Sequence, residues 1–186
     1  MGEDRTAAVL DAVELLTSDV VTGLGLQHLS PRGAHPRRAR VHVYGSAAQG
    51  FAGEDSDVDL TIHVPFEDLR DVWRLVRGPR EENTPRALAQ AFLQALGTRC
   101  QSQSLLSFVE FVPGARVPVL TLRLGSVRCD VTVNNLLPLH NTQLLAAYVR
   151  GCGGLAGVAR AVIAWARDAG VLGAPHGHLS AYPFCS

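Results

Sequence analysis

Apolar residues repeat along the chain at two spacings, which separate expected helices from expected strands. A repeat of three to four residues lines one face of a helix, and a repeat of two lines one face of a strand. The pattern predicts helices over residues 4–21, 66–76, 84–97, 141–148 and 155–169. It predicts strands over 105–112, 117–124 and 127–133, with two shorter strands beginning at Val41 and Asp57. Thr84-Pro85 and Asn141-Thr142 are the expected helix starts.

The strand expected over 127–133 has one polar face. Its four apolar residues fall on one side, whereas Arg128, Asp130 and Thr132 fall on the other. Aspartate is a poor residue in the middle of a strand unless something requires it. Asp130 is therefore a candidate functional carboxylate, and a surface aspartate near a strand end is the structural alternative.

Two further carboxylates, Asp57 and Asp59, stand two residues apart where a strand is expected to begin. Their side chains then share one face, and two like charges side by side are unfavourable without a cation between them. Upstream, Gly45-Ser46 offers a backbone that can approach a ligand closely and a hydroxyl group. Carboxylates beside a glycine-serine turn indicate a divalent metal that carries a phosphorylated ligand.

Composition restricts the function classes. The chain has 186 residues, is 47% hydrophobic and has zero formal net charge, so any RNA-binding surface must be local. All seventeen of its Lys and Arg residues are arginines. Four scattered cysteines form neither a disulfide framework nor a zinc motif. No apolar run reaches membrane-spanning length, and the acidic N-terminus is unlike a presequence. These features favour the cytoplasm and leave mitochondria and the nucleus open.

Two blocks carry a resemblance to a known family. Gly45-Ser46 followed by Asp57-Val58-Asp59 resembles the signature of the DNA polymerase β-like nucleotidyltransferase superfamily. The blocks at 129–135 and 139–148 resemble the poly(A) polymerase-like terminal uridylyltransferases. The resemblance extends from about Val41 to Tyr182 and includes both blocks.

The resemblance implies a two-metal site with Mg²⁺, for which Mn²⁺ can substitute. Asp57 and Asp59 would hold both metals, and Asp130 would help to activate an RNA 3′ hydroxyl. Gly45 and Ser46 would contact the triphosphate.

The remaining nucleotide contacts implied by the resemblance lie towards the C-terminus. Asn141 would contact the ribose 2′ hydroxyl, with a helix cap as the alternative. Tyr182 would stack under the base, with a core aromatic as the alternative. Arg167 would keep a positive charge over the triphosphate.

Three positions depart from the family pattern. Ile163 stands where a lysine is usual, and Arg160 is the nearby substitute. Ala181 replaces the usual serine before the tyrosine, and the glycine-rich stretch 151–154 replaces an expected Asp and Arg. These losses concern nucleotide holding rather than metal chemistry, so they predict a weakened or specialised enzyme.

We therefore expect an α/β (α+β) fold: a polymerase β-like nucleotidyltransferase domain with a mixed, largely antiparallel sheet backed by helices. Its expected bounds are 26–137, and residues 1–25 and 138–186 would be parts of an incomplete helical second domain. The expected activity is template-independent addition of UMP from UTP to an RNA 3′ end, without a membrane partner. The alternatives are a poly(A) polymerase using ATP, an inactive RNA-binding or scaffold subunit, and an enzyme acting on a protein or small molecule.

Overall fold

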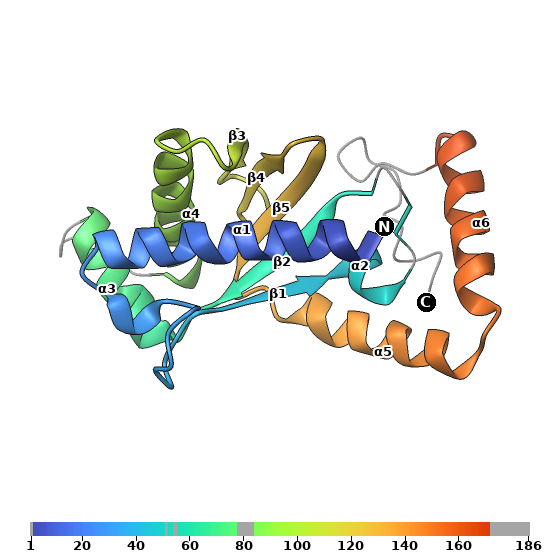
Figure 1. The fold of residues 1–186 in the computed structure, drawn as a ribbon, viewed down its shortest axis with the longest axis horizontal. Coiled ribbons are helices and arrows are strands. Elements are labelled where there is room, and N and C mark those ends of the chain that lie inside the picture. Colours follow the sequence, from blue (N-terminus) through green and yellow to red (C-terminus); the bar gives the residue numbers. More distant parts are fainter. Residues whose placement is uncertain (1, 51, 54–55, 78–83, 172–186) are drawn as a thin grey trace.

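The computed structural model describes residues 2–50, 52–53, 56–77 and 84–171 (Figure 1). The helices are α1 (Gly2–Gly23), the 3-10 turn η1 (Gln27–Leu29), α2 (Gly45–Gln49), α3 (Phe66–Arg77), α4 (Pro85–Gln101), α5 (Leu137–Gly151) and α6 (Leu155–Asp168). The strands are β1 (Arg40–Tyr44), β2 (Val58–His63), β3 (Ser107–Val112), β4 (Val119–Leu124) and β5 (Val127–Val133). Apart from η1 and α2, the helices and strands follow the predicted order, so the α/β (α+β) fold class is confirmed.

The five strands form one mixed sheet in the order β1-β2-β5-β4-β3. β2 and β5 run parallel at its centre, whereas the other three neighbouring pairs are antiparallel. Gly125, at a positive φ of 59°, makes the turn between β4 and β5. The parallel pair is the one that brings distant parts of the sequence together.

The hydrophobic core lies on the apolar face of this sheet. Alternate residues of β2, β4 and β5 pack there against α1, α3 and α4. Figure 1 shows α1 running across the strands, with α3 and α4 on the left of the view. Leu60 and Ile62 of β2 and Phe92 of α4 are completely buried. The opposite face of the sheet carries the polar residues, so the fold leaves that face for chemistry.

Two local predictions are wrong. Gly45–Gln49 forms a short helix instead of a turn and loop. Gly45 takes a positive φ of 69°, the next four residues are compatible with a helix, and Gly50 ends it at a φ of 80°. Asn141-Thr142 does not cap a helix, because α5 already begins at Leu137 with Pro138 in its first turn. Smaller shifts occur at α4, which continues to Gln101, and at β3 and β4, which each begin two residues later than predicted.

The buried face of α6 also differs from the prediction. The helical spacing of Val158, Val162 and Trp165 predicts that these residues share the apolar, buried side of the helix, but Val158 and Trp165 are each 61% exposed. Instead Ala159 is buried with Leu145 of α5, and Ile163 packs against them. Small residues let the two helices approach closely. The larger apolar face of α6 therefore points away from α5. The proposed boundary between residues 26–137 and the flanking helices stays a prediction.

None of the helices in the described part of the chain is long and apolar enough to cross a membrane.

Asn134 fastens the end of the parallel strand pair. Its Oδ1 accepts a hydrogen bond from the Val64 N–H at 2.8 Å, and its Nδ2 donates to the Val64 carbonyl at 2.8 Å. Its φ of 52° is in the left-handed region, which asparagine tolerates better than most residues. Both bonds join the end of β5 to the residue that follows β2.

Asn134→Ala should therefore lower the free energy of unfolding by about 1–3 kcal/mol, because two partly buried backbone groups lose their partner and the strained φ remains. Urea denaturation checks this. Gln101→Ala, at the exposed end of α4, is the control and should change stability by less than about 0.5 kcal/mol. Equal effects of the two substitutions would contradict the role assigned to Asn134.

Candidate active site

The parallel register of β2 and β5 places Asp59 directly opposite Asp130. Both side chains point to the polar face of the sheet, because residues of a register pair share a face. The strand β2 begins at Val58, one residue later than predicted, so Asp57 lies just before it. Asp57 still interacts electrostatically with both other carboxylates. The structure thus brings together the three aspartates that the sequence singled out, across some seventy residues of chain.

The environment of the site disturbs the protonation of Asp57 and Asp59. Burial, followed by the charges of Asp130 and Asp57, raises the pKa of Asp59 to about 7. Burial and then Asp130 also raise the pKa of Asp57, although the Arg128 guanidinium opposes them. Without a further cation, Asp59 is therefore only partly ionised near neutral pH.

Two residues that sequence reasoning missed hold Asp130. Thr121 Oγ1 donates a hydrogen bond to Asp130 Oδ1 at 2.7 Å from the register position directly opposite on β4. Arg128 Nε lies 3.7 Å from Asp130 Oδ1 and 3.8 Å from Asp57 Oδ2. A threonine at the centre of the apolar strand β4, and an arginine two residues before Asp130, were the signals that could have identified them.

The backbone at Gly45 packs directly against Asp59. Gly45 has a φ of 69°, and a Cβ at this position would overlap Asp59 Oδ2. Its N–H donates to Thr142 Oγ1 of α5 at 2.9 Å. Glycine is therefore required both for the backbone conformation and for the close approach. Thr142, expected as part of a cap, instead ties α5 to this turn.

The other predicted nucleotide contacts are more dispersed. Ser46 is partly buried in the first turn of α2, and Asn141 is partly buried one residue before Thr142. Arg167 is exposed in the last turn of α6. Arg160 of the same helix donates to the Gly50 carbonyl at 3.1 Å, so it reaches the segment that follows α2. Tyr182 and Ala181 lie outside the described residues.

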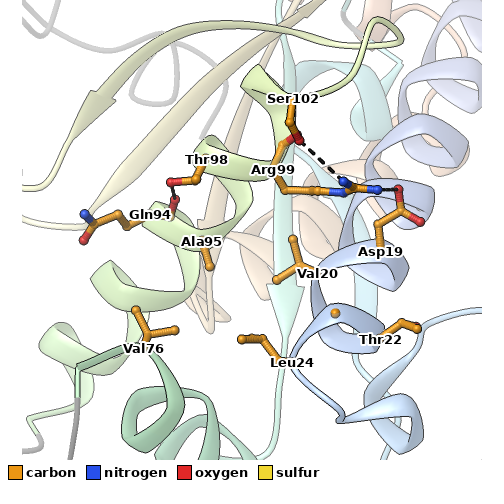
Figure 2. A pocket seen from close by; sticks show the side chains of 11 residues that line it. Asp19, Val20, Thr22, Leu24, Val76, Gln94, Ala95, Thr98, Arg99 and Ser102 are labelled. Atoms are coloured by element: carbon orange, nitrogen blue, oxygen red, sulfur yellow. Dashed lines mark hydrogen bonds and ion pairs between the residues drawn. The ribbon is translucent and has the colours of Figure 1, made fainter.

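A pocket of 720 Å³ lies elsewhere, between α1, α3 and α4 (Figure 2). Its lining is largely apolar, with an ion pair of 3.3 Å between Asp19 Oδ2 and Arg99 Nη2 at one side. None of the predicted site residues lines it. The helices around it cover the apolar face of the sheet, so this pocket is separate from the aspartates.

The chemistry of the three carboxylates suits a hard divalent cation such as Mg²⁺, which prefers oxygen ligands. Two features support the fit. Asp59 has a raised pKa beside two other carboxylates. The glycine at position 45 has no Cβ, so the space beside Asp59 Oδ2 is not filled by a side chain from that position. Within the described residues, however, no three His, Cys, Asp or Glu side chains converge enough to hold one ion together. The three carboxylates must therefore move closer together to share one ion.

Comparison with known proteins identifies the family. Residues 26–150 match the family model of the mitochondrial-like poly(A) RNA polymerase central palm domain. The chain belongs to this family. The matched segment contains both carboxylate strands, the Gly45 turn and α5, which confirms the recognition made from the sequence. The 186-residue chain is therefore termed the palm chain.

Individual relatives agree with this membership. The palm chain is 26% identical over 148 residues to the poly(A) RNA polymerase GLD2-A of Xenopus laevis and 27% identical over 150 residues to GLD2-B of the same organism. Each alignment covers 78% of the palm chain but 26% of the relative. The palm chain thus spans about a quarter of the length of these curated relatives.

Solved structures confirm the fold. A crystal structure of the Cid1 poly(U) polymerase is similar with a TM-score of 0.67 at 22% identity, covering 98% of the palm chain and 46% of that chain. The structure of a GLD-2/RNP-8 complex is similar with a TM-score of 0.65 at 18% identity, covering 89% and 53%. The polymerase β-like nucleotidyltransferase fold expected from the sequence is therefore confirmed.

The raised pKa of Asp59 predicts a pH-dependent stability in EDTA. The folded chain keeps this proton up to about pH 7, whereas the unfolded chain loses it near the usual value of 3.8. The free energy of unfolding should therefore fall as pH rises from about 4 to about 7, by at most about 1.4 kcal/mol per pH unit. Asp59→Asn should remove most of this fall. Urea denaturation at several pH values measures it, and parallel curves for the two proteins would contradict the assignment.

Gly45→Ala should destabilise the palm chain more than Gly50→Ala. Both glycines have a positive φ, so each alanine suffers roughly 1–2 kcal/mol of backbone strain. Only at position 45 does the new Cβ also meet Asp59, whereas nothing lies within 4 Å of a Cβ at position 50. Denaturation midpoints of the two variants give the difference. Equal losses would show that Gly45 and Asp59 are not in close contact.

Proposed function

We propose that the palm chain is the catalytic domain of a template-independent nucleotidyltransferase that adds nucleoside monophosphates to an RNA 3′ end. One observation carries the proposal: Asp59 and Asp130 stand opposite each other on adjacent parallel strands, with Gly45 packed against Asp59. Membership of the poly(A) RNA polymerase central palm domain family supports the proposal.

Asp57 and Asp59 are the residues proposed to hold the metals, and Asp130 completes the set beside the attacking hydroxyl. Bound Mg²⁺ would neutralise charge on the triphosphate and favour ionisation of the RNA 3′ hydroxyl. Thr121 keeps Asp130 oriented through its 2.7 Å hydrogen bond. In this proposal the protein contributes mainly position and electrostatic complementarity.

The turn at Gly45 and Ser46 is proposed to approach the triphosphate. Thr142 of α5 accepts a hydrogen bond from the Gly45 N–H and so holds this turn in position. Asn141 precedes Thr142 and is the proposed contact to the ribose 2′ hydroxyl, and Tyr182 is the proposed platform for the base. Arg167 remains a proposed triphosphate contact. Arg160 supports the same function, because its contact with Gly50 places a guanidinium beside the segment after α2.

UTP is the proposed nucleotide, and ATP is the second candidate. The fold shared with the Cid1 poly(U) polymerase favours UTP, whereas the family model and the GLD2 poly(A) polymerases favour ATP. A subunit that only binds RNA is less consistent with the site, because all three carboxylates and the close-packed glycine are retained. We propose the cytoplasm as its location and RNA and a nucleoside triphosphate as its substrates.

Full-length protein incubated with a 5′-labelled RNA, Mg²⁺ and each nucleoside triphosphate in turn tests this function. We expect extension with UTP, resolved nucleotide by nucleotide on a gel. Asp130→Asn should reduce the extension rate by about a hundredfold or more, while triphosphate binding stays nearly unchanged. Asp71→Asn, at a side chain of α3 that is 47% exposed, is the matched control and should retain activity.

Extension with ATP alone would replace the uridylyl assignment with the adenylyl one. Lack of extension with all four nucleotides, at protein concentrations well above those needed for catalysis, would contradict the enzymatic proposal.

A further inference from the structure

Arg128 is a basic side chain set among the candidate metal ligands. It lies two residues before Asp130 on β5 and therefore on the same polar face of the sheet. Its Nε is 3.8 Å from Asp57 Oδ2 and 3.7 Å from Asp130 Oδ1. One guanidinium thus forms ion pairs with Asp130 of β5 and with Asp57, which lies just before β2. Within the described residues, it is the one basic group in an ion pair with these aspartates.

These contacts are electrostatically attractive but too long for good hydrogen bonds. Charge-assisted N–H···O bonds are usually about 2.7–2.9 Å long, and both distances exceed that range. Arg128 Nε is buried and has no hydrogen-bond partner among the described residues. A buried N–H without a partner is unfavourable. Arg128 is therefore held by the charge of the carboxylates rather than by matched hydrogen bonds.

Partial exposure gives Arg128 room to leave. Its side chain is 42% exposed, and the side chains of Asp57 and Asp130 are 50% and 30% exposed. Ion pairs at such positions are screened by water and are worth about 1 kcal/mol or less. A divalent ion with direct oxygen ligands brings twice the charge and a shorter contact, so it can displace the guanidinium.

Arg128 contacts only part of the carboxylate cluster. It forms ion pairs with Asp57 and Asp130 but not with Asp59. The three acidic side chains do not converge on one point within the described residues.

We propose that Arg128 serves as the resident cation of the metal-free palm chain and competes with divalent ions for Asp57 and Asp130. Metal binding then requires the guanidinium to swing out, which makes Arg128 a positioning residue that sets how much metal the site needs. This inference rests on the proposed function, because it takes the aspartates to be metal ligands.

Titration of full-length protein with MnCl₂ tests the competition, with free Mn²⁺ measured by electron paramagnetic resonance. Arg128→Gln keeps a similar side-chain length without charge and should bind Mn²⁺ roughly fivefold more tightly. Arg128→Lys keeps the charge and should bind like the wild type. Arg123→Gln is the matched control, because Arg123 is exposed, lies opposite Arg128 in register and has no ion pair with the aspartates among the described residues.

Thermal unfolding gives an independent readout. In EDTA, Arg128→Gln should melt below the wild type, because Asp57 and Asp130 lose their cation. At saturating MnCl₂ the difference should disappear, because the metal replaces the guanidinium. A purely structural role would lower the melting temperature equally in both conditions.

Unchanged or weaker Mn²⁺ binding by Arg128→Gln would overturn the inference. If Asp59→Asn abolishes Mn²⁺ binding while Arg128→Gln leaves it unchanged, the metal site stands and only the role of Arg128 fails. If the wild-type protein binds no Mn²⁺ at these aspartates, the proposed metal site fails and the inference with it.

Discussion

The parallel pairing of β2 with β5 is the constraint on which the rest of this structure depends. It places Asp59 opposite Asp130, where two carboxylates repel each other inside a partly buried sheet. The neighbouring features help to maintain that placement. Asn134 fastens the far end of the pair, and the buried apolar residues on the other face hold the strands against α1, α3 and α4. The sheet thus keeps an unfavourable charge arrangement in place by stable packing elsewhere.

Without a metal, the palm chain reduces that repulsion in two ways. Asp59 takes up a proton more readily than a free carboxylate, because burial and its neighbours raise its pKa to about 7. Arg128 supplies positive charge to Asp57 and Asp130. Both devices are reversible, since a divalent ion can displace the proton and the guanidinium together. The charge repulsion among the carboxylates is thus partly relieved without metal and would be relieved further by a bound divalent ion. Such a site is consistent with the proposed metal-dependent transfer.

Much of this could be predicted from the sequence, because the relevant signals are local. Alternation over 127–133 placed Asp130 on a polar face, and spacing placed Asp57 beside Asp59. The partners of these residues could not be predicted, since they depend on register between strands. Thr121 supports Asp130 only because β4 pairs with β5 in that alignment, and Thr142 reaches Gly45 only through the packing of α5. Helix α6 shows the same limit. Its periodicity marked Val158 and Trp165 as buried, but the neighbouring helix packs on Ala159.

We propose that Asp57 and Asp59, with Asp130 beside them, hold the metal that acts on a triphosphate. Crystals of the full-length protein grown with MnCl₂ and a non-hydrolysable nucleoside triphosphate test it through the anomalous scattering of manganese. We expect manganese coordinated by Asp57 and Asp59 and by the triphosphate, with Arg128 moved away from Asp57. Manganese bound only elsewhere, with Arg128 still between Asp57 and Asp130, would contradict it.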